Sequence, residues 1–215
     1  MHDGMDDLSV WPSSALIIRH GFGNHEKHRY ATLNLIFTEQ SKELKDGKTT
    51  KLFMPTRRQD LETWDNSTRA GFYELLIEQH QPDIIFCNSS GGNVLTEIVR
   101  RGKWNGPSFI VSGRKVKDLP SINPQLPVLF VHGLNDNYRL IEDLKSRMGR
   151  AELHTFEGGH GAEAFFDMEN ALQVREITNL VVACLQLRNQ PLGPLPEQSQ
   201  LSPREILLAA ISRST

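Results

Sequence analysis

The stretch that most constrains this chain is residues 83–95, which read Asp-Ile-Ile-Phe-Cys-Asn-Ser-Ser-Gly-Gly-Asn-Val-Leu. A short apolar run after Pro82 predicts a buried parallel strand, and this run ends abruptly at Cys87. Apolar residues then recur at helical spacing up to Gly102, which predicts a helix that stops there. A strand, a tight turn and a helix with a serine at the apex together predict a serine held in a strained backbone conformation.

Two adjacent serines occupy this turn, and the size of their neighbours separates them. A turn this tight requires small residues two positions before and two positions after its apex. Cys87 and Gly91 meet this requirement for Ser89, whereas a nucleophile at Ser90 would place the larger Asn88 at the first of these positions. We therefore predict that Ser89 is the nucleophile. The turn alone is weak evidence, because serine and glycine are common in ordinary loops.

Apolar runs and helical patterns alternate along the rest of the chain. Alternation of this kind implies right-handed crossovers and a parallel sheet covered on both faces. We therefore predict an α/β fold, a three-layer α/β/α sandwich around a mainly parallel six-stranded sheet. Apart from the strand and helix around Ser89, the predicted strands are residues 15–18, 51–54, 107–113, 127–131 and 151–156, and the predicted helices are residues 27–45, 67–79, 138–148 and 164–187.

The chain of 215 residues is long enough for one domain with a sizeable core. We expect residues 1–188 to form this domain and residues 189–215 to form a linker followed by a short terminal helix. The linker contains four prolines up to Pro203, and an apolar segment follows it. Two alternatives stay open for this terminal helix, which either packs on its own domain or contacts a partner or a second subunit.

The charge and the apolar content exclude several classes of partner. A net charge of −2 gives no reason to expect nucleic acid or an anionic membrane surface. No apolar run approaches the roughly 20 residues of a membrane helix, and residues 1–9 lack the apolar core of a signal peptide. The spacing of Cys87 and Cys184 suggests neither a disulfide framework nor a metal site. We expect a cytoplasmic protein without stable membrane insertion, which acts on a small-molecule or acylated substrate, with a homodimer as one open assembly.

An acid and a histidine follow two of the later predicted strands. Asp136 ends the sequence Val-His-Gly-Leu-Asn-Asp, and His160 lies within Glu-Gly-Gly-His-Gly. The carboxyl ends of parallel strands meet at one edge of a sheet, so both side chains are expected near Ser89. Nucleophilic catalysis needs a base for the serine and a group that orients this base. We predict that His160 is the general base and that Asp136 orients it.

The remaining candidates are less well placed for this chemistry. Glu142 and Asp143 are fallback acids, but both fall inside a predicted helix. His20 and His132 precede glycines at strand ends, and we interpret them as structural hydrogen-bonding residues. His20, His25 and His28 are the residues that could ligate a metal ion, but we expect no metal site there.

A serine elbow, an acid and a histidine in this order resemble the α/β hydrolase superfamily, and the likeness covers about residues 15–187. It is closer to compact serine esterases of the carboxylesterase and acyl-thioesterase type than to large lipases. In that group a strand end with a proline, followed by a Trp-Asp pair, lines the site, and Met54-Pro55 with Trp64-Asp65 is similar. The resemblance implies neither a metal nor an organic cofactor.

The resemblance also implies an oxyanion hole made of two backbone N–H groups. One belongs to Ser90, which follows the nucleophile at the start of a helix, where the helix dipole favours negative charge. The other is expected in the sequence His-Gly-Phe-Gly after the first strand, which resembles the His-Gly-x motif of esterases. Phe22 is the expected donor there and Gly23 the alternative. An ordinary strand-to-helix turn is the other interpretation of this sequence.

Members of the superfamily that carry a lid usually insert it between the fourth and fifth strands of this prediction. Here residues 114–126 make this connection, which is too short for a cap domain. Only residues 1–14 precede the first predicted strand, so the first two antiparallel strands of the family are not expected. We therefore predict the minimal six-stranded sheet, in the order 2-1-3-4-5-6, with an open and shallow site.

Basic residues follow two of the strands that would border this site. Arg57 and Arg58 come after the second strand, and Arg114, Lys115 and Lys117 come after the fourth. Arginine pairs suit bidentate binding of a carboxylate or a phosphate. An anionic substrate is therefore one interpretation of these residues, and a solvated surface is the other.

The leading hypothesis is a serine hydrolase that cleaves a carboxylic ester or thioester through an acyl-Ser89 intermediate. The same site would also support acyl transfer, cyclisation, lyase or dehydration chemistry, because one fold hosts many reactions. A non-catalytic binding protein on this scaffold is the alternative from another class. Binding alone does not need a serine, an acid and a histidine in this order, which favours an enzyme.

Overall fold

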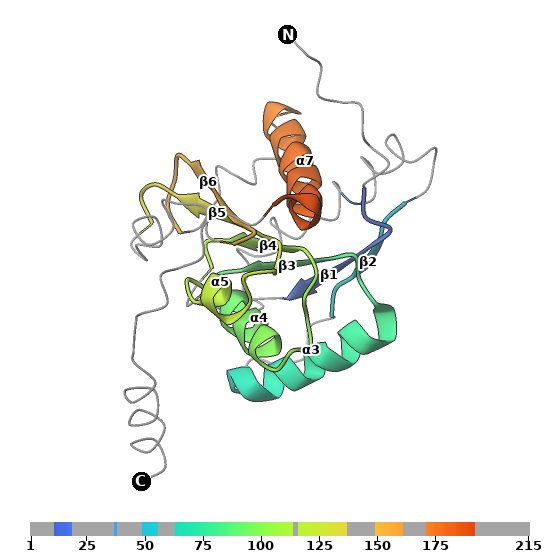
Figure 1. Cartoon of the computed structure of the whole chain (residues 1–215). Coiled ribbons are helices and arrows are strands. Elements are labelled where there is room, and N and C mark those ends of the chain that lie inside the picture. Colours follow the sequence, from blue (N-terminus) through green and yellow to red (C-terminus); the bar gives the residue numbers. More distant parts are fainter. Residues whose placement is uncertain are drawn as a thin grey trace.

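The structure is a computed structural model that describes residues 11–18, 37, 49–55, 63–113, 116–136, 149–160 and 171–191. Six strands of this part of the chain form one sheet in which all neighbouring strands are parallel. Their order, β2-β1-β3-β4-β5-β6, confirms the predicted order (Figure 1). The strands are β1 (Ser14–Ile18), β2 (Lys51–Phe53), β3 (Ile84–Asn88), β4 (Ser108–Val111), β5 (Val128–Gly133) and β6 (Ala151–Phe156).

Helices cover both faces of this sheet. Figure 1 shows α3, α4 and α5 together on one side and α7 on the other, which confirms the three-layer sandwich. A 3₁₀ turn, η4, follows α7 directly. The described helical elements are α3 (Asn66–His80), α4 (Gly91–Arg100), α5 (Leu119–Ile122), α7 (Ala171–Gln186) and η4 (Leu187–Asn189).

Strand β1 shows why the central strands are apolar throughout. Ala15 and Ile17 belong to the core cluster that includes Val181 of α7, and Leu16 belongs to the cluster that includes Leu95 of α4. Successive side chains of a strand point to opposite faces, and here both faces are covered. Burying one such aliphatic side chain contributes about 1.5–3 kcal/mol to folding. Continuous apolar runs are therefore what a central parallel strand of this sheet requires.

Most of the predicted elements that lie in the described residues are close to their observed bounds. The predicted strand 151–156 coincides with β6, and the predicted helix 67–79 is α3 with one more residue at each end. Asp65 begins α3, because its carboxylate accepts a hydrogen bond from the Thr68 N–H at 2.7 Å. The predicted helices 27–45 and 138–148 lie outside the described residues, apart from residue 37.

The connection between β4 and β5 differs from the prediction in two details. Strand β4 ends at Val111 rather than at residue 113, because Ser112 has a φ of 46° and leaves the extended conformation. The four-residue helix α5, with Pro120 in its first turn, was not predicted. It is the one helix in the described part of this connection, so that part contains no cap domain.

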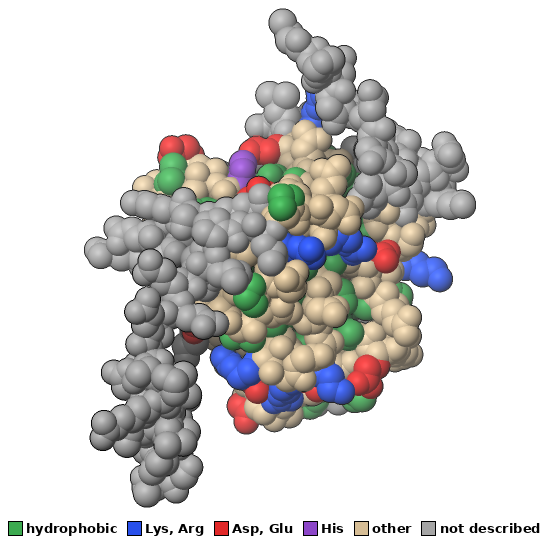
Figure 2. Space-filling view, viewed as in Figure 1, with side chains coloured by type: hydrophobic (Ala, Val, Ile, Leu, Met, Phe, Trp, Pro, Cys, Tyr) green, Lys and Arg blue, Asp and Glu red, His purple; other side chains and the backbone are tan. Residues whose placement is uncertain are grey.

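Charged side chains join α3 to α4 on the outer face. The guanidinium of Arg101 contacts Glu97 at 2.9 Å and Glu74 of α3 at 3.2 Å. Lys103 lies 3.2 Å from Glu78. In Figure 2, basic and acidic side chains alternate along the lower part of the molecule, where α3 and α4 lie. Exposed pairs of this kind stabilise a fold only modestly, so the apolar core carries most of the stability.

Candidate active site

The turn after β3 has the geometry that its sequence predicts. Ser89 follows the last residue of β3 and has a φ of 46°, a value that non-glycine residues rarely adopt. Its N–H donates to the Val111 carbonyl of β4 at 3.0 Å, and its own carbonyl accepts from the Gly92 N–H at 3.1 Å. These contacts hold the serine at the junction of β3 and α4. Ser89 is 2% exposed, so its surroundings fix it firmly.

The turn is packed too tightly for a side chain at Gly91. A Cβ atom there would lie 2.7 Å from the backbone oxygen of Ile18 and 3.2 Å from the Cβ of Cys87. Backbone cannot move away as easily as a flexible side chain can, so a larger residue at this position would have to displace the end of β1 or the turn itself. The small residues two positions before and after Ser89 therefore face each other across the turn.

A chain of two hydrogen bonds links Ser89 to a buried acid. Ser89 Oγ lies 2.7 Å from Nε2 of His160, and Nδ1 of His160 lies 2.9 Å from Oδ2 of Asp136. Both distances are those of good hydrogen bonds. The Asp136 side chain is fully buried, whereas that of His160 is 26% exposed. The ring of His160 therefore contacts a buried acid on one side and remains accessible to solvent on another.

Backbone hydrogen bonds between two loops hold the acid and the histidine together. The N–H of Leu134 donates to Phe156 at 2.9 Å, and the N–H of Asn135 donates to Gly158 at 2.9 Å. The Asp136 N–H donates to the Gly133 carbonyl at 3.0 Å, which closes the turn after β5. The loops after β5 and β6 are thus joined side by side, and they carry Asp136 and His160 to the same edge of the sheet.

The predicted oxyanion donors are described only in part. Ser90 is the N-cap of α4, so its backbone lies at the positive end of the helix dipole. Its carbonyl accepts a hydrogen bond from Asn93 at 3.0 Å. Further predicted site residues lie outside the described residues: Phe22, Gly23, Arg57, Arg58, Glu142 and Asp143.

Trp64 makes a packing contact with α3. Its ring lies 6.0 Å from that of Phe72 in an edge-to-face arrangement, and Phe72 in turn contacts Tyr73 at 5.4 Å. Trp64 is half-buried. This contact explains its position by the packing of α3, and its predicted role in substrate binding stays a prediction.

A second histidine approaches Asp136, and the sequence interpretation did not assign it to the site. His132 is 2% exposed, and its Nε2 lies 3.7 Å from Asp136 Oδ2. Nε2 has no hydrogen-bond partner among the described residues, so the structural hydrogen bond expected of His132 is not made through this atom. Burial lowers the pKa of His132, and the nearby His160 lowers it further, against an opposing effect of Asp136. The His-x-x-x-Asp spacing is the signal that would have suggested this contact.

The cysteine beneath the turn does not compete with Ser89 as a nucleophile. Burial raises the pKa of the Cys87 thiol far above its ordinary value. Burial likewise raises the pKa of Cys184 to about 12. A thiol must lose its proton to become a good nucleophile, so both groups are inert at neutral pH.

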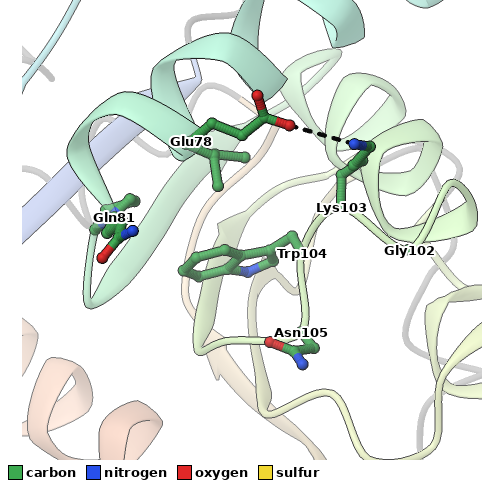
Figure 3. A pocket seen from close by; sticks show the side chains of 8 residues that line it. Glu78, Gln81, Gly102, Lys103, Trp104 and Asn105 are labelled. Carbon is green, nitrogen blue, oxygen red and sulfur yellow. Dashed lines mark hydrogen bonds and ion pairs between the residues drawn. The ribbon is translucent and has the colours of Figure 1, made fainter.

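A surface pocket of about 330 Å³ lies away from these residues (Figure 3). It is formed where α3 and α4 end and where β3 begins, and its lining includes Gln81, Pro82 and the ring of Trp104. Figure 3 shows the ion pair between Glu78 and Lys103 at its edge. Ser89, Asp136 and His160 follow the opposite, carboxyl ends of their strands, so this pocket does not belong to the candidate site.

Neither a metal-binding cluster nor a membrane-spanning helix occurs in the described part of the chain. No group of three or more His, Cys, Asp or Glu residues suited to a metal ion occurs among these residues. None of the helices described has both the length and the apolar character needed to cross a membrane.

Comparison with solved structures shows which fold this arrangement belongs to. A protein from Xanthomonas campestris pv. campestris, named as an inferred hydrolase of the alpha/beta superfamily, is similar with a TM-score of 0.57 at 14% identity, over 80% of this chain and 98% of that one. A protein from Thermoplasma acidophilum, named as a predicted CIB-like hydrolase, is similar with a TM-score of 0.55 at 16% identity, over 88% of this chain and 90% of that one. No protein-family model and no curated protein matches the sequence.

Proposed function

Since the chain has the α/β hydrolase fold, we propose that it is a serine hydrolase that cleaves a carboxylic ester or thioester through an acyl-Ser89 intermediate. The observation that carries this proposal is the hydrogen-bonded chain from Ser89 through His160 to Asp136, with distances of 2.7 and 2.9 Å. Each of the three residues follows its own strand at one edge of the sheet. Binding alone would not require this chain of proton donors and acceptors.

The chemistry follows from the two hydrogen bonds. Nε2 of His160 takes the proton of Ser89 while Oγ attacks the acyl carbon, and Asp136 stabilises the imidazolium that forms. The negative charge of the tetrahedral intermediate develops near the N–H of Ser90, with Phe22 as the second proposed donor. His160 then protonates the leaving alcohol or thiol. Water, deprotonated by His160, attacks the acyl-serine ester, and the proton returns to Ser89 as the free acid leaves.

The proposal is tested by labelling with a fluorophosphonate probe together with hydrolysis of p-nitrophenyl acetate. The wild type is expected to label and to release acetate, and Ser89→Ala is expected to do neither. Ser112→Ala is the matched control, because Ser112 is a buried serine with the same φ of 46° at the end of the neighbouring strand. It is expected to label like the wild type.

Three outcomes would contradict the proposal in different ways. Labelling of Ser89→Ala would assign the nucleophile to another serine, with Ser90 next in line. A folded wild type that neither labels nor hydrolyses the ester would remove the serine hydrolase proposal altogether. Consumption of the ester without free acid, in the presence of an added acceptor, would indicate acyl transfer rather than hydrolysis.

A further inference from the structure

Two histidines approach the same oxygen of Asp136. Nδ1 of His160 lies 2.9 Å from Oδ2, and Nε2 of His132 lies 3.7 Å from it. The side chains of His132 and Asp136 are 2% and 0% exposed, so water does not surround either group. Nε2 of His132 has no hydrogen-bond partner among the described residues. A buried polar atom without a partner is costly, and such atoms are often found where function requires them.

The charge of Asp136 decides which form of His132 fits this position. A lone pair on Nε2 would repel the carboxylate oxygen, whereas an N–H there would be attracted to it, and the buried surroundings strengthen both effects. Burial is the largest influence on the pKa of His132 and lowers it. Asp136 raises this pKa and His160 lowers it, and the net result is a lowered pKa. The neutral ring with its proton on Nε2 is therefore the form that the site favours.

We propose that His132 is a positioning residue, whose neutral Nε2–H stabilises the Asp136 carboxylate in the orientation that holds His160. The separation of 3.7 Å is longer than a hydrogen bond, so the contact acts as an attraction between a charge and a dipole. Because His132 stays neutral, it does not repel the positive charge that His160 carries during the reaction. The effect on turnover rests on the proposed function of Ser89, whereas the effect on the ring of His160 does not.

The groups around His132 make its effect on the ring of His160 measurable. Among the described residues, the charged or titratable groups that act on it are Asp136, on the loop after β5, and His160, on the loop after β6. Ser112 and Thr155 flank it on the neighbouring strands, and neither changes its charge near neutral pH. A change in the titration of the His160 ring after substitution of His132 therefore reports on the pair of Asp136 and His160.

Two substitutions separate the N–H of His132 from its volume. His132→Leu fills similar space without a donor, and His132→Gln places an amide N–H at a similar reach. His132→Leu is expected to lower kcat for p-nitrophenyl acetate about three- to tenfold, with KM changed less than about twofold. The acid limb of kcat/KM is expected to move to higher pH, because a carboxylate that has lost the attraction of this N–H holds a proton on His160 more tightly. His132→Gln is expected to restore both quantities.

A second measurement does not depend on turnover. The ring of His160 is followed by NMR as the pH is changed, and its midpoint is expected to move to higher pH in His132→Leu but not in His132→Gln. In an Asp136→Asn background, His132→Leu is expected to cause no further shift, because the carboxylate through which His132 acts is gone. If the wild type shows no hydrolysis, this titration still tests the contact, so failure of the two proposals can be told apart.

The proposal is overturned by either of two results. One is that His132→Leu and His132→Gln share the titration midpoint of the wild type and its kcat, which would make His132 a space-filling residue. The other is that the shift caused by His132→Leu persists in the Asp136→Asn background. Should His132→Leu fail to fold, His132→Met takes its place as the substitution without a donor.

Discussion

Ser89 and Ser112 occupy corresponding places at the ends of neighbouring strands, but among the described residues only Ser89 contacts a histidine. Both have a φ of 46°, and they are 2% and 1% exposed. Ser89 Oγ lies 2.7 Å from Nε2 of His160. Ser112 Oγ has no hydrogen-bond partner among the described residues. The same backbone strain thus occurs with and without a histidine at hydrogen-bonding distance.

The chain that follows each serine also differs. Ser89 leads directly into α4, whose ten residues place a helix dipole behind the turn. Ser112 leads through Gly113 into a connection whose described helix, α5, has four residues. Strain at this edge of the sheet is therefore not in itself a sign of chemistry. What distinguishes Ser89 is a histidine within hydrogen-bonding distance and a ten-residue helix that begins directly after the turn.

The largest effect that tests this contrast is expected from Asp136→Asn. An amide at this position can present its NH₂ group to Nδ1 of His160, and the ring proton then lies on Nε2. A protonated Nε2 cannot accept the proton of Ser89. We expect kcat for p-nitrophenyl acetate to fall about 10³- to 10⁴-fold with the fold intact, as judged by circular dichroism. Ser112→Ala serves as the control. Activity within about tenfold of the wild type would mean that His160 does not depend on Asp136.

A pair of cysteine substitutions compares the two serine positions directly. At Ser89 a new thiol would lie beside His160, which can take its proton, whereas at Ser112 it would be buried without a base. Alkylation by iodoacetamide is expected to be about 100-fold faster or more for Ser89→Cys than for Ser112→Cys. The native thiols give little background, because burial raises the pKa of both Cys87 and Cys184.

The outcome of this comparison is read by peptide mass spectrometry at each site. Equal rates would show that His160 does not activate the group at position 89 and that accessibility alone governs both positions. Faster alkylation of Ser112→Cys would reverse the contrast between the two strand ends.

Two glycines that follow these serines extend the contrast to packing. A Cβ at Gly91 would lie 2.7 Å from the backbone oxygen of Ile18, and one at Gly113 would lie 2.4 Å from Cγ2 of Ile110. Each Gly→Ala substitution is expected to lower the free energy of unfolding by about 1–3 kcal/mol, measured by urea denaturation. Only Gly91→Ala should also displace Ser89, with a loss of roughly tenfold or more in the activity of the folded protein. An equal loss of activity in Gly113→Ala would contradict a role confined to the β3 turn.

The sequence predicts the sheet well because its strands are buried on both faces. Short apolar runs bounded by loops leave little ambiguity in such a sheet, and the predicted strand 151–156 coincides with β6. Parallel strands bring their carboxyl ends to one edge, so the approach of Asp136 and His160 to Ser89 also followed from their order along the chain. The catalytic roles of these three residues stay predictions until the labelling experiment is made.

Features that depend on local geometry were not predictable in the same way. Serine gives no signal for a positive φ, so the predicted strand 107–113 ran past Ser112, where β4 has already ended. A histidine before a glycine at a strand end is a common structural pattern, and the approach of His132 to Asp136 depends on the path of the loop after β5. The four-residue helix α5 is too short to show a helical period in the sequence.

The smallest expected effect concerns how the free energy of unfolding changes in acid through His132, at this edge of the sheet. Because burial lowers the pKa of His132 below its ordinary value of 6.5, the unfolded chain binds more protons than the folded one below about that pH. Stability is therefore expected to fall as the pH drops from about 6.5, by at most about 1.4 kcal/mol per pH unit from this residue. His132→Gln removes the titrating ring and should flatten this part of the pH dependence, measured by urea denaturation between pH 5 and pH 8.

The control is Ser112→Ala, which changes the neighbouring strand end but no titrating group. Its stability should depend on pH with the same slope as that of the wild type. An unchanged slope in His132→Gln would show that His132 takes up its proton as readily in the folded protein as in the unfolded chain.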